Sequence, residues 1–99
     1  MTSSLPEARN GRASDVRTTA EALIVDLVDG RTITVPLGWY PRLAHASEAE
    51  RADCRVIADG AGIHWPALDE DISVEALLSG RGSAESPASL DRWLRARVG

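Results

Sequence analysis

The sequence has one cysteine, no phenylalanine and no lysine among its 99 residues. A lone cysteine, Cys54, cannot form an intramolecular disulfide, so the disulfide-stapled class of small proteins is excluded and a reducing compartment is favoured. No apolar run approaches the roughly 20 residues that a membrane-spanning helix needs. Residues 1–10 also lack the apolar segment of a secretory signal. We therefore expect a cytoplasmic protein with no membrane partner.

The net charge of −4 argues against a general nucleic-acid-coating role, because such a role needs a basic face. All eleven basic residues are arginine, which fits either bidentate ion pairs or the codon usage of a GC-rich genome. The charges are unevenly placed. The acidic block comprises Asp69, Glu70, Asp71 and Glu75, and the basic C-terminal part comprises Arg81, Arg92, Arg95 and Arg97.

Alternation of apolar and polar residues predicts a β-hairpin near the N-terminus. Residues 23–28 alternate, and Asp29-Gly30 supplies a two-residue turn because both residues tolerate positive φ. Residues 31–35 form the return strand, and a first strand at residues 16–19 would extend the hairpin into a meander. Further short strands are expected at residues 55–58 and 62–65.

Capping residues predict the helices. Pro41 suits the first position of a helix, and Ser47 with Glu50 has the spacing of a capping box. Ser73 and Ser89 are expected to cap the last two helices. The apolar positions of those helices are Val74, Leu77 and Leu78, then Leu90, Trp93 and Leu94.

Together these elements predict an α+β fold, in which a small antiparallel sheet built on an N-terminal hairpin or meander packs with three or four short helices. We expect a disordered leader at residues 1–12, an α+β domain at residues 13–80, and a linker with a C-terminal amphipathic helix at residues 81–99. That last helix could dock on its own domain or on a second copy, which would give a homodimer.

Three sequence blocks carry a family resemblance. They read LVDGRTI at residues 27–33, VPL followed by WYPRL within residues 35–43, and GIHWPALDEDISVEALL at residues 62–78. In this order they resemble the bacterial domain-of-unknown-function family 2442, over about residues 14–80. The resemblance implies a small α+β domain with short flanking helices and brings no catalytic residues. Some members carry a helix-turn-helix segment, which this chain lacks, and others are encoded beside a second small protein, as in toxin–antitoxin-like pairs.

Candidate metal and catalytic groups are few. His64 with Asp69 and Asp71 offers imidazole and carboxylate ligands, but zinc sites prefer four cysteines or histidines, and only Cys54 and His45 remain as candidates. The alternative is that His64 hydrogen-bonds a neighbouring carboxylate or carbonyl group. We expect no metal, no cofactor and no catalytic residue.

The three consecutive acids directly precede the predicted helix at Ser73, where the helix dipole favours negative charge. Helix capping, docking of a partner's arginine and acid–base catalysis all remain open for them. Trp39 and Tyr40 lie beside prolines and are expected to be partly exposed, whereas Trp65 is expected in the core. Aromatic residues near an arginine are typical of protein interfaces. The predicted partner-binding residues are Trp39, Tyr40, Arg42, His64, Trp65, Asp69, Glu70 and Asp71.

These features predict a non-enzymatic protein-interaction module that binds a second small protein, for example as one half of a toxin–antitoxin-like pair, or forms a homo-oligomer. The alternative is a transcriptional regulator that contacts DNA through the arginine-rich C-terminal helix, as a dimer or within a complex. An enzyme that uses His64 and the neighbouring acids is a third hypothesis.

Overall fold

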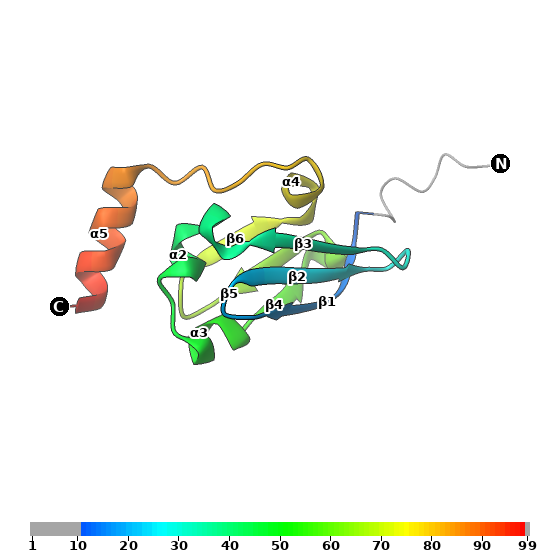
Figure 1. Cartoon of the computed structure of the whole chain (residues 1–99), viewed down its shortest axis with the longest axis horizontal. Helices are drawn as coiled ribbons and strands as arrows, with labels where there is room; N and C mark the ends of the chain where they lie inside the picture. Colours follow the sequence, from blue (N-terminus) through cyan, green and yellow to red (C-terminus); the bar gives the residue numbers. More distant parts are fainter. Residues whose placement is uncertain (1–10, 99) are drawn as a thin grey trace.

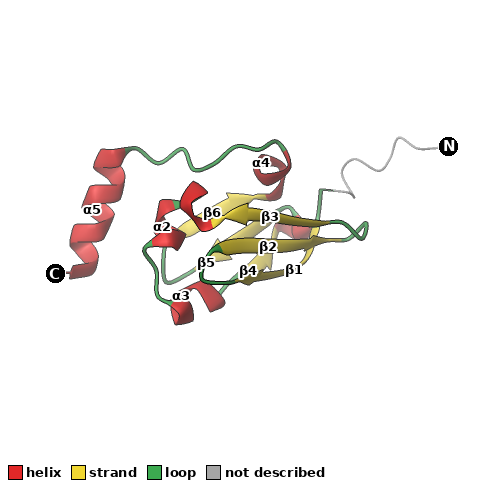
Figure 2. Cartoon of the chain, viewed as in Figure 1, coloured by secondary structure: helices red, strands yellow, loops and turns green. Residues whose placement is uncertain are grey.

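The computed structural model describes residues 11–98, whose elements are drawn in Figures 1 and 2. The strands are β1 (Ala13–Thr18), β2 (Ala22–Leu27), β3 (Thr32–Pro36), β4 (Arg55–Ile57), β5 (Gly62–Trp65) and β6 (Glu70–Ser73). The helices are η1 (Leu37–Trp39), α2 (Pro41–Ala44), α3 (Glu48–Ala52), η2 (Ala58–Gly60), α4 (Val74–Leu78) and α5 (Pro87–Val98). The predicted α+β fold is therefore confirmed. The first ten residues of the predicted leader lie outside the described residues.

The predicted N-terminal hairpin is confirmed, and it is part of a three-stranded antiparallel meander in the order β1-β2-β3. Gly30 adopts a φ of +98°, and the Asp29 side chain accepts a hydrogen bond from the Arg31 backbone N–H at 3.0 Å. β1 begins at Ala13, earlier than the predicted first strand. Leu23, Val25 and Leu27 lie on the buried face of β2, so the alternating residues of this segment do fall on opposite faces of the strand.

The second sheet has the antiparallel order β4-β5-β6, and β6 was not predicted. The three acids were expected to flank a helix start, but Glu70 and Asp71 belong to this strand. Ile72 is buried and pairs with Ile63 of β5, so burial of this one apolar side chain sets which face of β6 points into the core. Only Glu75 is an acid in the first turn of α4, whose cap is Ser73 as predicted. The helix-dipole explanation for Asp69, Glu70 and Asp71 was therefore wrong.

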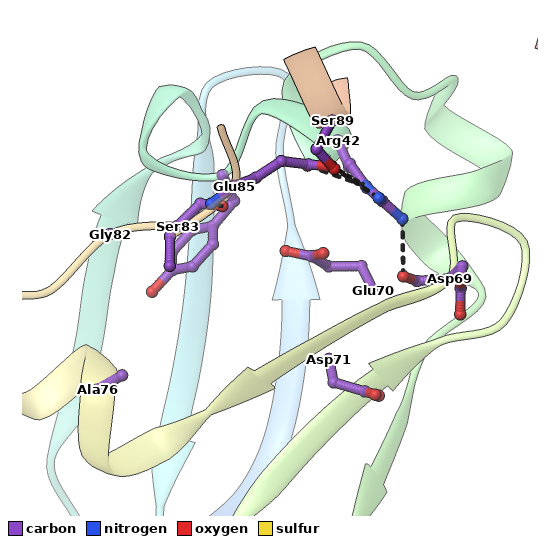
Figure 3. A pocket seen from close by; sticks show the side chains of 11 residues that line it. Arg42, Asp69, Glu70, Asp71, Ala76, Gly82, Ser83, Glu85 and Ser89 are labelled. Carbon is purple, nitrogen blue, oxygen red and sulfur yellow. Dashed lines mark hydrogen bonds and ion pairs between the residues drawn. The ribbon is translucent and has the colours of Figure 1, made fainter. Parts of the chain in front are cut away.

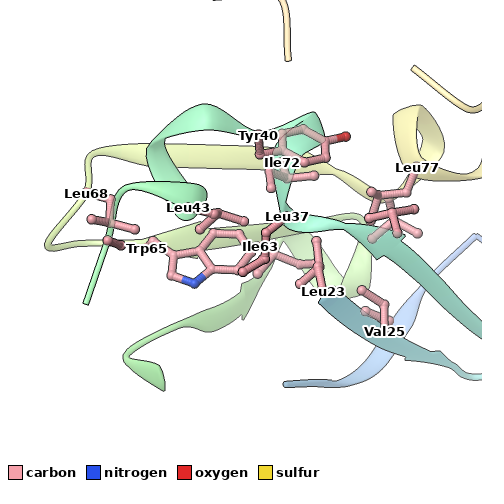
Figure 4. Packing of buried hydrophobic residues seen from close by; sticks show 14 of the residues in the cluster. Leu23, Val25, Leu37, Tyr40, Leu43, Ile63, Trp65, Leu68, Ile72 and Leu77 are labelled. Carbon is pink, nitrogen blue, oxygen red and sulfur yellow. The ribbon is translucent and has the colours of Figure 1, made fainter. Parts of the chain in front are cut away.

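A single apolar core lies between the two sheets and the short helices (Figure 4). Trp65 is the largest fully buried side chain, and its indole N–H donates to the Arg51 carbonyl at 3.0 Å. Tyr40 was expected to be partly exposed, yet only 3% of its surface is exposed. Its ring packs in the core, and its hydroxyl donates a hydrogen bond to the Arg81 carbonyl at 2.9 Å.

Two of the predicted helix starts agree with the structure to different degrees. The capping box of Ser47 and Glu50 is present at α3. The last helix begins earlier than predicted, because the hydroxyl of Ser86 rather than Ser89 accepts a hydrogen bond from the first turn, and Pro87 occupies that turn. No helix in the described part of the chain is long and apolar enough to cross a membrane.

Figure 1 shows α5 beside the end of the domain that carries α2 and α3, joined to α4 by an extended segment. Within this chain α5 packs on its own domain, and Trp93 is the residue of the helix that contacts the core. The final position of α5 brings the C-terminal segment next to residues far away in sequence.

Candidate functional site

An open pocket of about 390 Å³ lies between α2, β6, the segment before α5 and the start of α5 (Figure 3). Its polar lining comprises Tyr40, Arg42, Asp69, Glu70, Asp71, Ser83, Glu85 and Ser89. Five of these were predicted as partner-binding residues from the sequence. The structure therefore brings the second block of the family resemblance next to the third.

Arg42 is the most extensively bonded residue of the pocket. Its Nη1 donates to the carbonyl oxygens of Leu68 at 3.2 Å and Asp69 at 2.9 Å. Its Nε and Nη2 form a bidentate pair with Glu85 at 2.9 and 2.6 Å. The Arg42 and Glu85 side chains are only 16% and 8% exposed, and the guanidinium lowers the pKa of Glu85 below its ordinary value. Ser89 also donates to Glu85 at 2.8 Å, so this carboxylate is well satisfied.

Glu70 is the opposite case. It is half-buried and projects from β6 into the pocket (Figure 3). No residue in the described range gives its carboxylate a hydrogen bond or an ion pair. Burial raises the pKa of Glu70 to about 7, the attraction of Arg42 opposes this rise, and the charge of Glu85 adds to it. Glu70 is thus a carboxylate whose charge is poorly compensated within its own chain.

His64 and Asp71 lie opposite each other on β5 and β6, and the His64 Nδ1 is 2.5 Å from an Asp71 carboxylate oxygen. This is the hydrogen bond that the alternative to a metal site predicted. Among the described residues, no three histidine, cysteine or acidic side chains are arranged to hold a metal ion. Burial raises the pKa of the Cys54 thiol, which disfavours the nucleophilic thiolate.

The other predicted aromatic residues fall in different places. Trp39 is 37% exposed near the pocket, and its carbonyl accepts a hydrogen bond from the Ser83 backbone N–H at 2.9 Å. Trp65 has no exposed surface, so a partner that contacts the folded domain does not reach its side chain. Tyr40 lines the pocket although only 3% of its surface is exposed.

The sequence did not reveal how α5 is held. Trp93 donates from its indole N–H to the Leu68 carbonyl at 3.1 Å, and its ring lies under the guanidinium groups of Arg42 and Arg97, at 5.2 and 4.6 Å. Arg97 also forms two hydrogen bonds, of 2.8 and 3.1 Å, with the carboxylate of Glu50. We call the Arg42 guanidinium, the Leu68 carbonyl and the Glu50 carboxylate the clamp face. The apolar stripe through Trp93 was the only sequence signal for this contact.

Glu50 has two structural roles. Its side chain accepts a hydrogen bond from the Ser47 backbone N–H at 2.8 Å, which closes the capping box, while it also binds Arg97. The bonds from Arg97 and then from Ser47 lower the pKa of Glu50 to about 2. The carboxylate therefore remains charged throughout the neutral range.

A second hollow, of about 630 Å³, lies on another part of the surface. It is lined by the exposed apolar residues Val28, Val56 and Ile57, and its charged members Arg12 and Asp59 pair with each other at 3.1 Å. Its two charged side chains are thus paired with each other, whereas the first pocket holds the uncompensated Glu70, so the first pocket is the stronger candidate site.

Comparison with known proteins places the chain in a family. The model of the family described as "protein of unknown function (DUF2442)" matches residues 13–83. The chain belongs to this family. The suspected resemblance is therefore confirmed, and no curated protein matches the chain closely enough to count as a relative.

Two solved structures resemble this DUF2442 chain. A crystal structure of a protein of unknown function from Rhodospirillum rubrum is 30% identical, with a TM-score of 0.68, over 75% of this chain and 92% of that one. A solution structure of an uncharacterised protein from Chromobacterium violaceum is 21% identical, with a TM-score of 0.62, over 85% of this chain and 88% of that one. The second likeness concerns the fold alone.

The DUF2442 match ends at Ser83, before Glu85 and α5. Arg42, Leu68 and Glu50 lie inside the matched region, whereas Glu85, Trp93 and Arg97 lie outside it. The pocket is therefore built partly from the family domain and partly from the segment that follows it.

Proposed function

We propose that this chain is a non-enzymatic protein-interaction module, whose partner places a basic side chain against Glu70. One observation carries the proposal: Glu70 is a half-buried carboxylate in an open pocket, without a hydrogen-bond or ion-pair partner among the described residues. A charge that is removed from water is stabilised when an opposite charge is placed beside it. A partner's arginine or lysine would supply that charge.

The surroundings of Glu70 support a protein rather than a small molecule as the ligand. Asp69 and Asp71 are exposed beside it, and Trp39, which is 37% exposed, lies next to Ser83 of the pocket through its carbonyl. The acidic groups favour a basic ligand. The exposed tryptophan favours a protein segment, because tryptophan buries a large area with little loss of conformational freedom. The partner that we propose is a second small protein, as in toxin–antitoxin-like pairs.

The non-enzymatic part of the proposal is supported by the state of the reactive groups. The Cys54 thiol has a raised pKa and is half-buried, and His64 is already engaged by Asp71. Neither residue lines the pocket. A nucleophile beside a general base, the usual arrangement for covalent catalysis, is not formed by these two groups.

DNA binding by α5 has weaker support. Arg97 pairs with Glu50, and Arg95 pairs with Asp91 at 2.9 Å, so two of its arginines are already neutralised by carboxylates. Arg92 is exposed and adds one positive charge. A DNA-binding face normally neutralises several phosphates, which needs more unpaired basic groups than this.

The test uses the tagged full chain expressed in its native host, with the mass of each purified complex measured by light scattering. We expect one stoichiometric small partner with the wild type and its loss with Glu70→Gln. Glu75→Gln is the matched control, because Glu75 is an exposed acid on neighbouring α4, outside the pocket. Equal capture by Glu70→Gln and wild type would reject the proposed contact, and a monomer that captures nothing would reject the module itself.

A further inference from the structure

The clamp face is held in place by bonds within the family domain. Arg42 Nη1 is fixed by the Leu68 and Asp69 carbonyls, which leaves the Nε–Nη2 edge of the guanidinium directed at Glu85. The Glu50 carboxylate is positioned by the Ser47 backbone N–H of the capping box. None of these positioning bonds comes from the segment after Ser83. The face is therefore pre-organised to receive a carboxylate and a guanidinium from elsewhere.

The segment that now occupies the face is weakly embedded. No residue from Pro87 to Arg97 is fully buried, and the stretch from Arg81 to Ser86 has no regular secondary structure. Glu85, which lies just before α5, and Trp93 and Arg97 of α5 contact the clamp face through hydrogen bonds, ion pairs and ring contacts. Elements with few buried apolar contacts open at lower free energy than the core of a domain.

We propose that the clamp face is a docking site for a helical segment of a partner protein, and that α5 is its exchangeable internal occupant. The partner segment presents a carboxylate to Arg42, an indole N–H to the Leu68 carbonyl, and a guanidinium to Glu50. This inference rests on the proposed function, since it assumes that the chain binds a partner. α5 and the preceding Glu85 already show the charge and hydrogen-bond complementarity to the face that such a partner segment needs.

Exchange makes docking conditional on the release of α5. A partner segment competes with a helix that is tethered to the same domain. Its apparent affinity is therefore its intrinsic affinity multiplied by the fraction of molecules in which α5 is released. Loosening α5 should therefore tighten binding in trans without any change in the face. This relation is directly measurable.

The test uses a fluorescent synthetic peptide of residues 84–99 as the probe and the full chain as the receptor. We expect the peptide to bind Glu85→Ala/Trp93→Ala at least about tenfold more tightly than it binds wild type, because α5 no longer competes effectively. Adding Arg42→Gln to that variant should abolish the gain. Adding Arg55→Gln, which removes the same charge from exposed β4, should preserve it.

Two results would overturn the inference. One is a folded Glu85→Ala/Trp93→Ala variant that binds the peptide no more tightly than wild type. The other is a wild-type dimer that dissociates on Glu85→Ala, since it would assign the face to a second copy of the chain. Because Glu70 contributes no bond to α5, peptide binding should survive Glu70→Gln. Failure of the Glu70 contact and failure of the clamp-face inference are thus distinguishable.

Hydrogen exchange of the wild type tests the same idea if the double variant does not fold. We expect the α5 amides to exchange at least about tenfold faster than those of β2 and β5, because α5 opens without global unfolding. Exchange of α5 at the rate of the core strands would show that it leaves only when the whole domain unfolds, and would overturn the proposal.

Discussion

Arg42 and Trp93 donate hydrogen bonds to the same atom, the carbonyl oxygen of Leu68, at 3.2 and 3.1 Å. The two side chains also stack, with the guanidinium 5.2 Å from the centre of the indole ring. One carbonyl thus links α2 to α5, two elements that are far apart in sequence. Because either donor satisfies the oxygen, loss of one should be partly tolerated, whereas loss of both should not.

The shared carbonyl predicts coupling between Trp93→Phe and Arg42→Gln. Trp93→Phe keeps an aromatic ring and removes the N–H, so alone it should cost about 1 kcal/mol of unfolding free energy. The double variant leaves the Leu68 carbonyl without either donor. Its loss of unfolding free energy should therefore exceed the sum of the two single losses by about 1 kcal/mol. Urea unfolding of the four proteins checks this. Additive free energies would contradict the shared-acceptor role.

The bidentate pair of Arg42 with Glu85 predicts that charge alone is insufficient at position 42. Arg42→Gln should lower the unfolding free energy by about 2 kcal/mol, because Glu85 is mostly buried and loses its cation. Arg42→Lys should restore only part of this, since an ammonium group cannot make the two parallel bonds. Arg81→Gln, which breaks the exposed pair with Glu75, should be indistinguishable from wild type in the same urea titration. Full rescue by lysine would show that geometry is unimportant here.

Much of the fold could be predicted because its determinants are local. The Asp29-Gly30 turn and the Ser47–Glu50 capping box each lie within a few residues, so the sequence contains the whole motif. β6 was missed because Asp69, Glu70 and Asp71 stand before a capped helix, where local rules assign acids to the helix dipole. What makes this segment a strand is its pairing with β5, which no local pattern records.

The candidate site was predictable only in part, for the same reason. Tyr40, Arg42 and the acids were identified from their chemistry, and the structure does gather them around one pocket. No local pattern predicts the role of Glu85, because its partner Arg42 is 43 residues away, in another element. Arg97 and Glu50 are separated by 47 residues, so the clamp face too depends on tertiary packing.

Gly60 and Gly30 form a matched pair for testing backbone constraint. Both have positive φ, +94° and +98°, but a Cβ at Gly60 would lie 2.8 Å from the Arg12 Cβ, whereas open space surrounds position 30. Gly30→Ala should cost about 1 kcal/mol of unfolding free energy from backbone strain alone. Gly60→Ala should cost at least about 1 kcal/mol more, because Arg12 and the Ala13 backbone must shift. Equal thermal unfolding of the two variants would mean that the contact at Gly60 relaxes freely.

The raised pKa of Glu70 predicts a specific pH dependence of stability. Its pKa rises from 4.5 in the unfolded chain to about 7 in the folded domain, so between these values the folded state holds more protons. The contribution of Glu70 to stability is therefore full below pH 4.5 and is lost as pH rises through 7. Glu50 acts in a separate window, because its pKa is lowered to about 2 and its contribution is lost as pH falls from 4.5 toward 2.

Glu70→Gln removes the ionisation that causes this loss. At pH 8 the variant should be more stable than wild type by about 2 kcal/mol, after allowance for the solvent that still reaches the carboxylate. At pH 4 the two proteins should unfold alike, because both then carry an uncharged side chain at position 70. Urea titrations at pH 4, 6 and 8 measure the difference, with Glu75→Gln as the control for removing an exposed acid outside the pocket. If the stability difference between Glu70→Gln and wild type does not grow with pH, the charge of Glu70 is already compensated in the free protein. The proposed contact with a partner's basic side chain would then lose its basis.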